Sequence, residues 1–194
     1  MDTDKFRLCT LTEEHFDAAL KLCCQVQGDN FYTWEQLKEE VRQGTIGDLS
    51  TSFIVYEIAT GKMVGLRLTS APGQWDREGD CSPEKWGVDP EKICYFHTAA
   101  VDPDYRGAGI GSYMLRTSIK VAQKMGAEAG LAHIWLQSPN NSAFNYFSRN
   151  GGQFIKEWPE KWIGYHTKER PCPRCGSTCH CDAAEMIIYF GEQD

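Results

Sequence analysis

The stretch Val101-Asp-Pro-Asp-Tyr-Arg106-Gly-Ala-Gly-Ile-Gly111-Ser112 decides how the rest of this chain is interpreted. It follows the apolar run Ile93–Val101, which predicts a strand, and it leads into Ser112–Met125, which predicts a helix. A glycine-rich turn between a strand and a helix directs backbone N–H groups and the positive helix end at one point. Its three glycines place no Cβ between those amides and a ligand. The stretch therefore predicts a pyrophosphate-binding loop.

Two other phosphate-binding motifs do not match this loop. A dinucleotide-binding loop spaces its glycines as Gly-x-Gly-x-x-Gly and has an acidic residue about 20 positions later, where this chain has Leu131. A P-loop requires Gly-Lys-Ser/Thr, which does not follow Gly111. The stretch instead resembles the Arg/Gln-x-x-Gly-x-Gly/Ala motif of the GCN5-related N-acetyltransferases, the GNAT superfamily, with its hydrophobic-x-Pro-x-aromatic lead-in. An ordinary glycine turn with a structural arginine is the alternative.

The resemblance implies a set of coenzyme-binding residues. In GNAT proteins the glycine loop holds the pyrophosphate of acetyl-coenzyme A, and the strand before it pairs with the acetyl and pantetheine groups. The stretch Asn140–Gly151 resembles a second GNAT pattern, Asn-x-x-Ala-x-x-Leu-Tyr-x-x-x-Gly-Phe, which touches the coenzyme near the pantetheine. The implied set is Ala99, Ala100, Val101, Arg106, Gly107, Ala108, Gly109, Ile110, Gly111, Ser112, Asn140 and Phe147.

The second pattern also bears on the acid that protonates the leaving thiolate. In many family members that acid is a tyrosine, but the corresponding position here is Phe147. Tyr146 lies one residue earlier, about 100° around the helix. Either a local shift brings Tyr146 into the site, or the chain has no tyrosine acid here. Core packing of both rings is the alternative interpretation.

Two side chains are candidates for the base that accepts the amine proton. Strand alternation predicts that His97 shares a face with Ala99 and Val101. His97 coincides with a catalytic histidine in the serotonin N-acetyltransferase branch of the family, and imidazole titrates at about 6.5. Glu57, at the end of the predicted strand 53–58, is a lesser candidate. A histidine buried for packing, and a reaction that uses only a water chain, stay open.

Cysteines concentrate near the C-terminal end, in Cys172-Pro-Arg-Cys175-Gly-Ser-Thr-Cys179-His180-Cys181. A Cys-x-x-Cys with a proline and a following glycine forms a knuckle whose amides point at metal-bound thiolates. The spacing predicts a zinc site held by Cys172, Cys175, Cys179 and Cys181. A closed thiolate shell leaves no position for a substrate water, so the metal would be structural. Whether His180 replaces a cysteine stays open, as do redox thiols and unliganded cysteines.

The remaining segments predict alternating helices and strands in the order β-α-α-β-β-β-α-β-α-β-β, which is the GNAT order. We expect an α/β (α+β) fold with a mixed, mostly antiparallel twisted sheet flanked by helices. Residues 1–194 would form a single domain, with the zinc loop at about 168–183 inserted between the last two strands. The expected strands are 6–10, 53–58, 63–68, 93–101, 130–136, 154–158 and 185–190. The expected helices begin near Thr12, Thr33, Ser112 and Asn140.

Composition narrows the class of protein. The net charge of −7 argues against nonspecific binding to nucleic acid or anionic membranes, which requires excess Lys and Arg. No apolar run reaches the roughly 18 residues that a membrane span needs. The first residues do not have the pattern of a signal peptide. Five of the nine cysteines are scattered without framework spacing, which favours reduced thiols and a cytoplasmic location. We expect a monomer or homodimer.

The resemblance implies an N-acetyltransferase that moves an acetyl group from acetyl-coenzyme A to a primary amine. The amine, on a small molecule or a protein, would attack directly in a ternary complex. A coenzyme A-binding sensor or interaction module without catalysis is the alternative, and a metal-dependent interaction protein is a second one. The sequence does not specify the acceptor.

Overall fold

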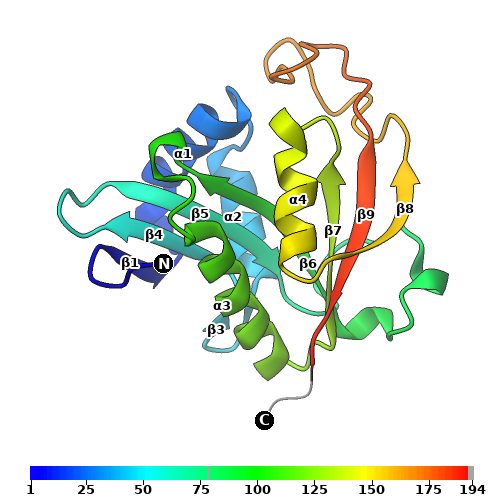
Figure 1. The fold of residues 1–194 in the computed structure, drawn as a ribbon, viewed down its shortest axis with the longest axis horizontal. Helices are drawn as coiled ribbons and strands as arrows, with labels where there is room; N and C mark the ends of the chain where they lie inside the picture. Colours follow the sequence, from blue (N-terminus) through cyan, green and yellow to red (C-terminus); the bar gives the residue numbers. More distant parts are fainter. Residues whose placement is uncertain (78, 192–194) are drawn as a thin grey trace.

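Seven strands form one sheet in the computed structural model, which describes residues 1–77 and 79–191. The order across the sheet is β1-β4-β5-β6-β7-β9-β8, and every neighbouring pair except β6 and β7 is antiparallel. The strands are β1 (Phe6–Thr10), β4 (Phe53–Glu57), β5 (Met63–Ser70), β6 (Ile93–Val101), β7 (Ala129–Trp135), β8 (Gln153–Trp158) and β9 (Ala183–Tyr189). The expected mixed, mostly antiparallel sheet is confirmed (Figure 1).

Four α-helices cover the two faces of the sheet (Figure 1). They are α1 (Phe16–Gln27), α2 (Trp34–Gln43), α3 (Ile110–Lys124) and α4 (Ser142–Arg149). The predicted capping box of α2 is present, because Thr33 and Gln36 exchange side-chain and backbone hydrogen bonds. α3 begins two residues earlier than expected, because Gly109 takes a left-handed conformation (φ 77°) at its N-cap. None of the helices in the described ranges has the length and hydropathy needed to cross a membrane.

The hydrophobic core is divided by the sheet. On one face, α1 and α2 pack over a cluster that includes Leu66, Leu68 and Ala100. On the other face, α3 and α4 pack over a cluster that includes Cys94 and Phe96. Cys94 and Phe96 thus face one layer and Ala100 the other, because the register of β6 against β5 shifts between them.

β6 and β7 are the one parallel pair of the sheet, and they pair over a short distance. Their register runs from Ile93 opposite Ala129 to Tyr95 opposite Leu131, and no further pair follows among the described residues. On the other side, β6 pairs with β5 through a bulge. Beyond Tyr95, β6 therefore leaves β7 and keeps only its β5 neighbour, so its backbone groups on the β7 side are free of ladder bonds.

One connection differs from the expectation. A small hairpin, β2 (Thr45–Ile46) and β3 (Leu49–Ser50), lies between α2 and β4 and was not predicted. The connection between the last two strands, referred to below as the insert, spans residues 159–182. It begins where β8 ends, at Trp158 as expected, and its first residues form turns.

A buried carboxylate fixes the irregular connection 71–92 to the sheet. Glu185 on β9 is fully buried and accepts hydrogen bonds from the Ser82 backbone N–H (3.1 Å) and the Trp86 indole (2.5 Å). Its second oxygen accepts from the Trp158 indole on β8 (2.8 Å). These three donors compensate the loss of hydration, so one side chain joins β8, β9 and the connection.

We predict that Glu185→Gln destabilises the protein by about 1–3 kcal/mol, because the amide nitrogen cannot accept and leaves a buried indole N–H unpaired. Glu128→Gln is the control, since Glu128 is an exposed residue paired with Lys92. Urea unfolding would measure both variants. Equal midpoints for Glu185→Gln and wild type would contradict the role assigned to this carboxylate.

Candidate functional site

The glycine loop projects from the end of β6 into open space. Asp102, just after β6, is buried, accepts from the Asp104 backbone N–H (3.0 Å) and pairs with Lys62 (2.8 Å). Gly107 (φ 85°) and Gly109 (φ 77°) both take left-handed conformations that L side chains rarely adopt. A Cβ added at Gly107 would meet no atom within 4 Å, whereas one added at Gly109 would lie 3.1 Å from the Met1 nitrogen. The backbone at Gly107 is therefore open to an anionic group.

Several predicted coenzyme residues lie around this loop. Ala99 is exposed on β6, and Arg106, Gly107, Ala108 and Gly109 are exposed in the loop. Ala100 and Ile110 are buried in the two core layers, so only their backbone groups are available to a ligand. Val101, Gly111 and Ser112 are partly buried. The structure thus brings together the β6 end, the loop and the first turn of α3.

The α4 residues divide between the surface and the core. Asn140 is exposed just before α4, in a left-handed conformation (φ 55°). Phe147 is 1% exposed and packs edge-to-face on Phe96, with ring centroids 5.9 Å apart. The expected contact of Phe147 with the coenzyme is therefore wrong: the ring fills the core between α4 and the sheet.

The Tyr146 side chain points from α4 toward α3. Its hydroxyl donates to the Gly111 carbonyl (2.9 Å) in the first turn of α3. Burial raises the pKa of Tyr146, which favours the protonated phenol. The ring thus bridges α3 and α4 where β6 and β7 separate below them.

His97 occupies the bulge of β6, and this corrects its expected orientation. Leu68 pairs with Thr98 and the next β5 residue, Thr69, pairs with Phe96, so His97 is the extra residue. The bulge breaks the strict alternation on which the expectation was based. His97 contacts Glu40 from α2 on one face, whereas Val101 packs with the α3 side chains on the other.

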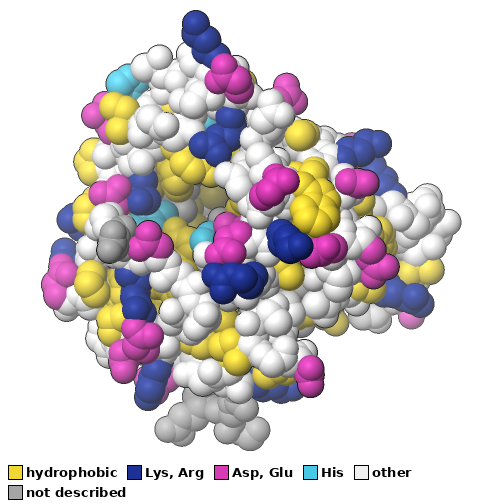
Figure 2. Space-filling view, turned by 180° about the vertical axis from the view of Figure 1, so that it is seen from behind, with side chains coloured by type: hydrophobic (Ala, Val, Ile, Leu, Met, Phe, Trp, Pro, Cys, Tyr) yellow, Lys and Arg dark blue, Asp and Glu magenta, His cyan; other side chains and the backbone are white. Residues whose placement is uncertain are grey.

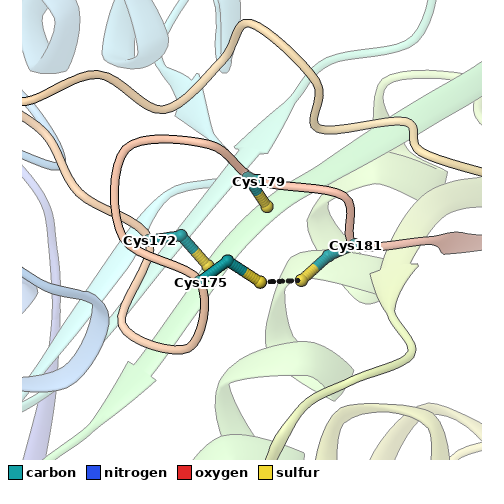
Figure 3. Close-up of side chains that lie close together, drawn as sticks. All are labelled: Cys172, Cys175, Cys179 and Cys181. Atoms are coloured by element: carbon teal, nitrogen blue, oxygen red, sulfur yellow. Dashed lines mark hydrogen bonds between the residues drawn. The ribbon is translucent and has the colours of Figure 1, made fainter.

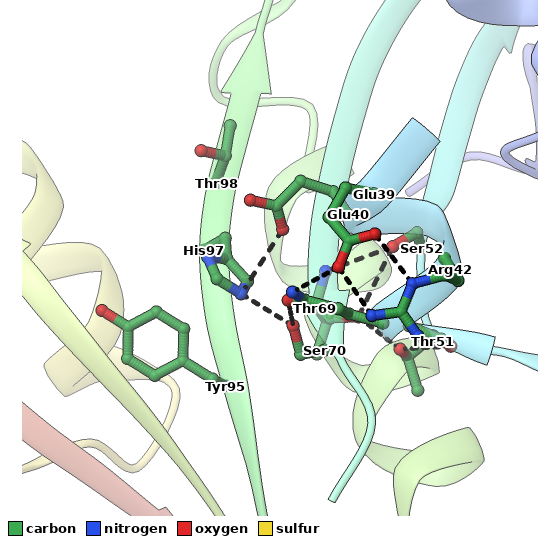
Figure 4. Close-up of polar contacts among 12 residues, drawn as sticks. Glu39, Glu40, Arg42, Thr51, Ser52, Thr69, Ser70, Tyr95, His97 and Thr98 are labelled. Carbon is green, nitrogen blue, oxygen red and sulfur yellow. Dashed lines mark hydrogen bonds and ion pairs between the residues drawn. The ribbon is translucent and has the colours of Figure 1, made fainter. Parts of the chain in front are cut away.

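Glu40 on α2 completes a polar group that the sequence analysis did not identify (Figure 4). Its Oε2 lies 3.4 Å from His97 Nε2 and is a buried oxygen with no hydrogen-bond partner in the described structure. His97 Nε2 also lies 2.7 Å from the Ser70 hydroxyl, which donates to Gln43 Oε1 (3.2 Å). Because the Ser70 hydroxyl donates its hydrogen to Gln43, it can only accept from His97. The protonated nitrogen of the neutral imidazole is therefore Nε2.

Burial sets the protonation of this pair. Desolvation, followed by the charge of Arg67, lowers the pKa of His97 to about 3, so the imidazole is neutral near pH 7. Desolvation, followed by the charge of Glu39, raises the pKa of Glu40 to about 7. The Glu40 carboxyl is therefore the group of the pair that gains and loses a proton near neutral pH.

Glu57 lies away from this pair. It is at the far end of the β4–β5 hairpin from Ser70 and accepts from the Tyr105 hydroxyl (3.0 Å). Hydrogen bonds from Thr60 and Tyr105 lower the pKa of Glu57. Glu57 supports the start of the glycine loop and does not join His97 and Glu40.

Aromatic side chains surround the Glu40–His97 pair. The Tyr32 hydroxyl, before α2, lies 2.9 Å from the Thr98 hydroxyl on β6. The Tyr95 ring meets the His97 imidazole edge-to-face, with ring centroids 4.6 Å apart. The Glu40 charge contributes, after desolvation, to the raised pKa of Tyr32 and of Tyr165. The face that carries α1 and α2 is hollowed near its centre, with hydrophobic side chains inside and His and acidic side chains at the edge (Figure 2).

The β8–β9 insert contributes one wall of this region. The Asn30 side chain donates to the Glu169 carbonyl (2.7 Å), joining the α1–α2 loop to the insert. Phe31 and Tyr165 meet edge-to-face, with ring centroids 6.4 Å apart. Residues far apart in the sequence thus form one aromatic rim.

The four predicted metal ligands gather at one point (Figure 3). The sulfur atoms of Cys172, Cys175, Cys179 and Cys181 all lie within 4.8 Å of one another. A tetrahedral zinc with Zn–S bonds of about 2.3 Å would separate its sulfurs by about 3.8 Å. The donor set and spacing therefore fit a closed thiolate site.

The local backbone supports this interpretation. Cys172 and Gly176 exchange two backbone hydrogen bonds (2.9 Å each), and Gly176 has φ 76°, which forms the expected knuckle. Burial opposes ionisation of Cys172, but amides of the knuckle bond its sulfur, and its pKa is lowered. His180 lies outside the cluster, with Nδ1 2.6 Å from Glu160 Oε1.

A signal for Glu40 was present in the sequence. Leu37, Glu40 and Val41 are three and four positions apart, so they share a face of α2. A carboxylate on the apolar face of an amphipathic helix is unusual unless it has a function or a partner. The partner, His97, was recognisable only as a separate candidate.

Comparison with solved structures agrees with this fold. The chain is similar to Ard1 from Thermoplasma volcanium (TM-score 0.66, 12% identity, 97% of this chain and 99% of that one). It is similar to the ribosomal-protein-S18-alanine N-acetyltransferase from Escherichia coli (TM-score 0.64, 15% identity, 97% of this chain and 96% of that one). It is also similar to Arabidopsis thaliana Naa50, solved with a bisubstrate analogue, CoA-Ac-MVNAL (TM-score 0.64, 16% identity, 96% of this chain and 99% of that one). At these identities the likeness shows the fold alone.

Sequence comparison gives the family. An uncharacterized N-acetyltransferase from Methanocaldococcus jannaschii is 28% identical over 74 residues, which cover 37% of this chain and 32% of that relative. The chain thus matches about a third of that protein's length. The model of the acetyltransferase (GNAT) family matches residues 20–152, which is more than half of the chain. Together with the sheet order and the glycine loop, this match shows that the chain belongs to the GNAT acetyltransferase family.

Proposed function

We propose that this protein is an N-acetyltransferase that transfers the acetyl group of acetyl-coenzyme A to a primary amine by direct attack in a ternary complex. One observation carries the proposal. β6 leads into an open anion-binding loop at one end and bears, at its bulge, the Glu40–His97 pair on the opposite face. A donor site and a proton acceptor thus lie on the same strand.

On the donor side, this chain's residues fit coenzyme A. The amides of Arg106–Gly111 and the α3 N-terminus would hold the pyrophosphate, and Arg106 would add a cation. The free β7 side of Ala99–Val101 would hydrogen-bond the amide groups of the pantetheine as an added strand does. Arabidopsis Naa50, which has the same fold, was solved with a coenzyme A conjugate.

On the acceptor side, the Glu40–His97 pair would take the proton of the attacking amine. An ammonium ion is attracted to the Glu40 carboxylate and to the faces of Tyr32 and Tyr165. Transfer of its proton to Glu40 frees the nitrogen lone pair for attack on the thioester carbonyl carbon. His97 stays neutral and holds the pair in place through Ser70.

Phe147 occupies the position where the family pattern has the tyrosine that protonates the leaving thiolate. Phe147 is in the core, and the Tyr146 hydroxyl is bonded to the Gly111 carbonyl. This arrangement also suits the alternative function, a coenzyme A-binding sensor without catalysis. A thiolate is a tolerable leaving group, so a missing acid lowers the rate without preventing transfer.

We propose that the four clustered cysteines bind one structural zinc ion. Four thiols this close cannot all ionise alone, whereas a divalent ion compensates their charges. The site would cross-link the insert that carries Tyr165 to the acceptor side. The partly buried Trp135 and Trp162 side chains pack against the cluster, and a hydrogen bond from the Trp135 indole to the Cys181 sulfur opposes the burial that raises the pKa of that thiol. Indole donors suit thiolate sulfurs held by a metal.

Mass spectrometry of an amine and peptide pool, incubated with isotopically labelled acetyl-coenzyme A, tests the function. We expect a labelled acetyl group on at least one primary amine. Arg106→Ala should raise the KM for acetyl-coenzyme A by roughly tenfold or more, because a charge-assisted phosphate contact is lost. Arg149→Ala, which changes an exposed α4 arginine, is the matched control. Coenzyme binding with no acetylated product would favour the sensor.

We predict that Glu40→Gln lowers kcat/KM by about 100-fold at pH 8, the lower end of the usual effect of a general base. In wild type, kcat/KM should rise as pH passes about 7, where Glu40 loses its proton, and the variant should lack this rise. Glu35→Gln, which changes an exposed carboxylate in the first turn of α2, is the matched control.

The same substitution has a readout that does not depend on activity. The raised pKa of Glu40 means that its folded form binds a proton more tightly than its unfolded form. Wild type should therefore lose stability as pH rises from about 4.5 to about 7. Glu40→Gln should remove that loss and melt higher, relative to wild type, at pH 8 than at pH 5. A constant difference at both pH values would contradict the buried carboxyl.

Elemental analysis of protein purified without added metal should find one zinc per chain. Cys175→Ser should lose metal and melt at a lower temperature, because metal affinity contributes to the stability of the insert. Cys24→Ser, which changes an exposed cysteine of α1, should do neither. Wild-type zinc content in Cys175→Ser, or no metal in wild type, would defeat the zinc proposal.

A further inference from the structure

Arg67 is a buried arginine without a counter-ion. It lies in the middle of β5 and is 2% exposed. Within residues 1–77 and 79–191 it makes no ion pair, and its buried Nε has no hydrogen-bond partner. Its guanidinium carbon lies 4.7 Å from the centroid of the Phe96 ring, a cation–π contact. That contact alone does not replace the hydration that the charge has lost.

The charge cannot be removed by proton loss. Burial lowers the pKa of Arg67, but a guanidinium starts above about 12 and stays protonated at neutral pH. A buried, unpaired cation destabilises a folded protein, and an apolar side chain of similar size would pack there at lower cost. Packing therefore does not explain an arginine at this position, and a negative charge that arrives with a ligand does.

The position of Arg67 indicates where that negative charge would arise. Arg67 pairs with Ala99 on β6, the exposed residue just before the glycine loop. Its guanidinium lies over Phe96, and its charge acts on Tyr146, whose hydroxyl bonds to the Gly111 carbonyl of α3. Its charge partly offsets the burial that raises the pKa of Tyr146, and it adds to the burial that lowers the pKa of His97. The Arg67 charge thus affects Tyr146 on one side of β6 and His97 on the other.

We propose that Arg67 stabilises the negative charge that forms on the sulfur of coenzyme A when the acetyl group leaves. This inference rests on the proposed acetyl transfer. In that step the amine nitrogen bonds to the carbonyl carbon, the C–S bond breaks, and the sulfur keeps the electron pair. The ammonium proton passes through Glu40 to solvent before the attack, and Glu40 then takes the second proton, which the nitrogen loses as the amide forms. Because no tyrosine acid lies in the expected place, a fixed cation supplies the stabilisation that a proton would otherwise give.

The other titratable groups near Arg67 do not produce the same effect. Burial raises the pKa of Cys94 to about 12 and raises that of Tyr146, so both stay neutral near pH 8. His97 is also neutral there, and the charge of Arg116 acts on Tyr146 in the same direction as that of Arg67. Glu40 titrates at about 7, but its negative charge would oppose formation of a thiolate, so it cannot produce the expected rise.

Calorimetry with coenzyme A and with desulfo-coenzyme A, which lacks the sulfur, tests the proposal. Binding would be measured at several pH values from about 6 to about 9, since an ordinary thiol has a pKa of about 8.5. In wild type, the ratio of the two affinities should rise with pH by about tenfold for each unit by which the bound thiol's pKa is lowered. Arg67→Met should abolish this rise.

Two further measurements separate charge from packing. Arg67→Met should melt at the wild-type temperature or above it, because it removes an unpaired buried cation. Phe96→Leu, which changes the packing around the guanidinium and keeps the charge, should retain the pH-dependent ratio. A lower melting temperature for Arg67→Met together with an unchanged ratio would make Arg67 a packing residue and overturn the proposal.

The wild-type titration decides the matter if Arg67→Met fails to fold. Coenzyme A that binds with an affinity ratio independent of pH would overturn the role of Arg67 and leave the acetyl-transfer proposal standing. Failure of wild type to bind either compound would instead overturn the proposed function.

Discussion

The short parallel contact between β6 and β7 is the constraint on which the rest of this structure depends. Three residue pairs hold the two strands together, and beyond Tyr95 the strands separate. An antiparallel neighbour would have continued the ladder, whereas here the backbone of Ala99–Val101 keeps hydrogen-bonding capacity on one side. The glycine loop, the first turn of α3 and Tyr146 of α4 are arranged around that unpaired segment.

The bulge at His97 determines which groups lie on which face. Without it, the imidazole would lie with Val101 beneath α3, and Glu40 on α2 would have no partner on β6. The extra residue turns His97 toward Glu40 and leaves Ala99 on the other side.

Two buried side chains of opposite charge are likewise separated by the sheet. The Glu40 carboxyl lies on the α1 and α2 side, and the Arg67 cation lies on the α3 and α4 side. This polarity suits a reaction that starts from a cation on one face and ends with an anion on the other.

Local sequence was sufficient for features that depend on neighbouring residues. The glycine loop, the α2 capping box and the Cys172–Cys181 knuckle all follow from spacing within about a dozen positions. Features that depend on the register between distant segments could not be predicted from the sequence. The bulge depends on how Leu68 and Thr69 meet β6, and the Phe147 orientation depends on how α4 sits on Phe96. Glu40 could have been suspected from its helix face, and Arg67 from its place in an apolar strand, but their partners could not.

The contact between the insert and the α1–α2 loop has a consequence for how acceptors would be selected. Tyr165 is carried by a long loop, and fixing such a loop costs conformational entropy. Its contacts with Phe31 and the bond from Asn30 to Glu169 order that loop. A metal ion at the four cysteines would restrict the loop further, so the aromatic rim would be ordered before an acceptor arrives. Affinity for an acceptor would then reflect the shape of a preorganised surface, and amines that do not match that shape could not be accommodated by rearranging it.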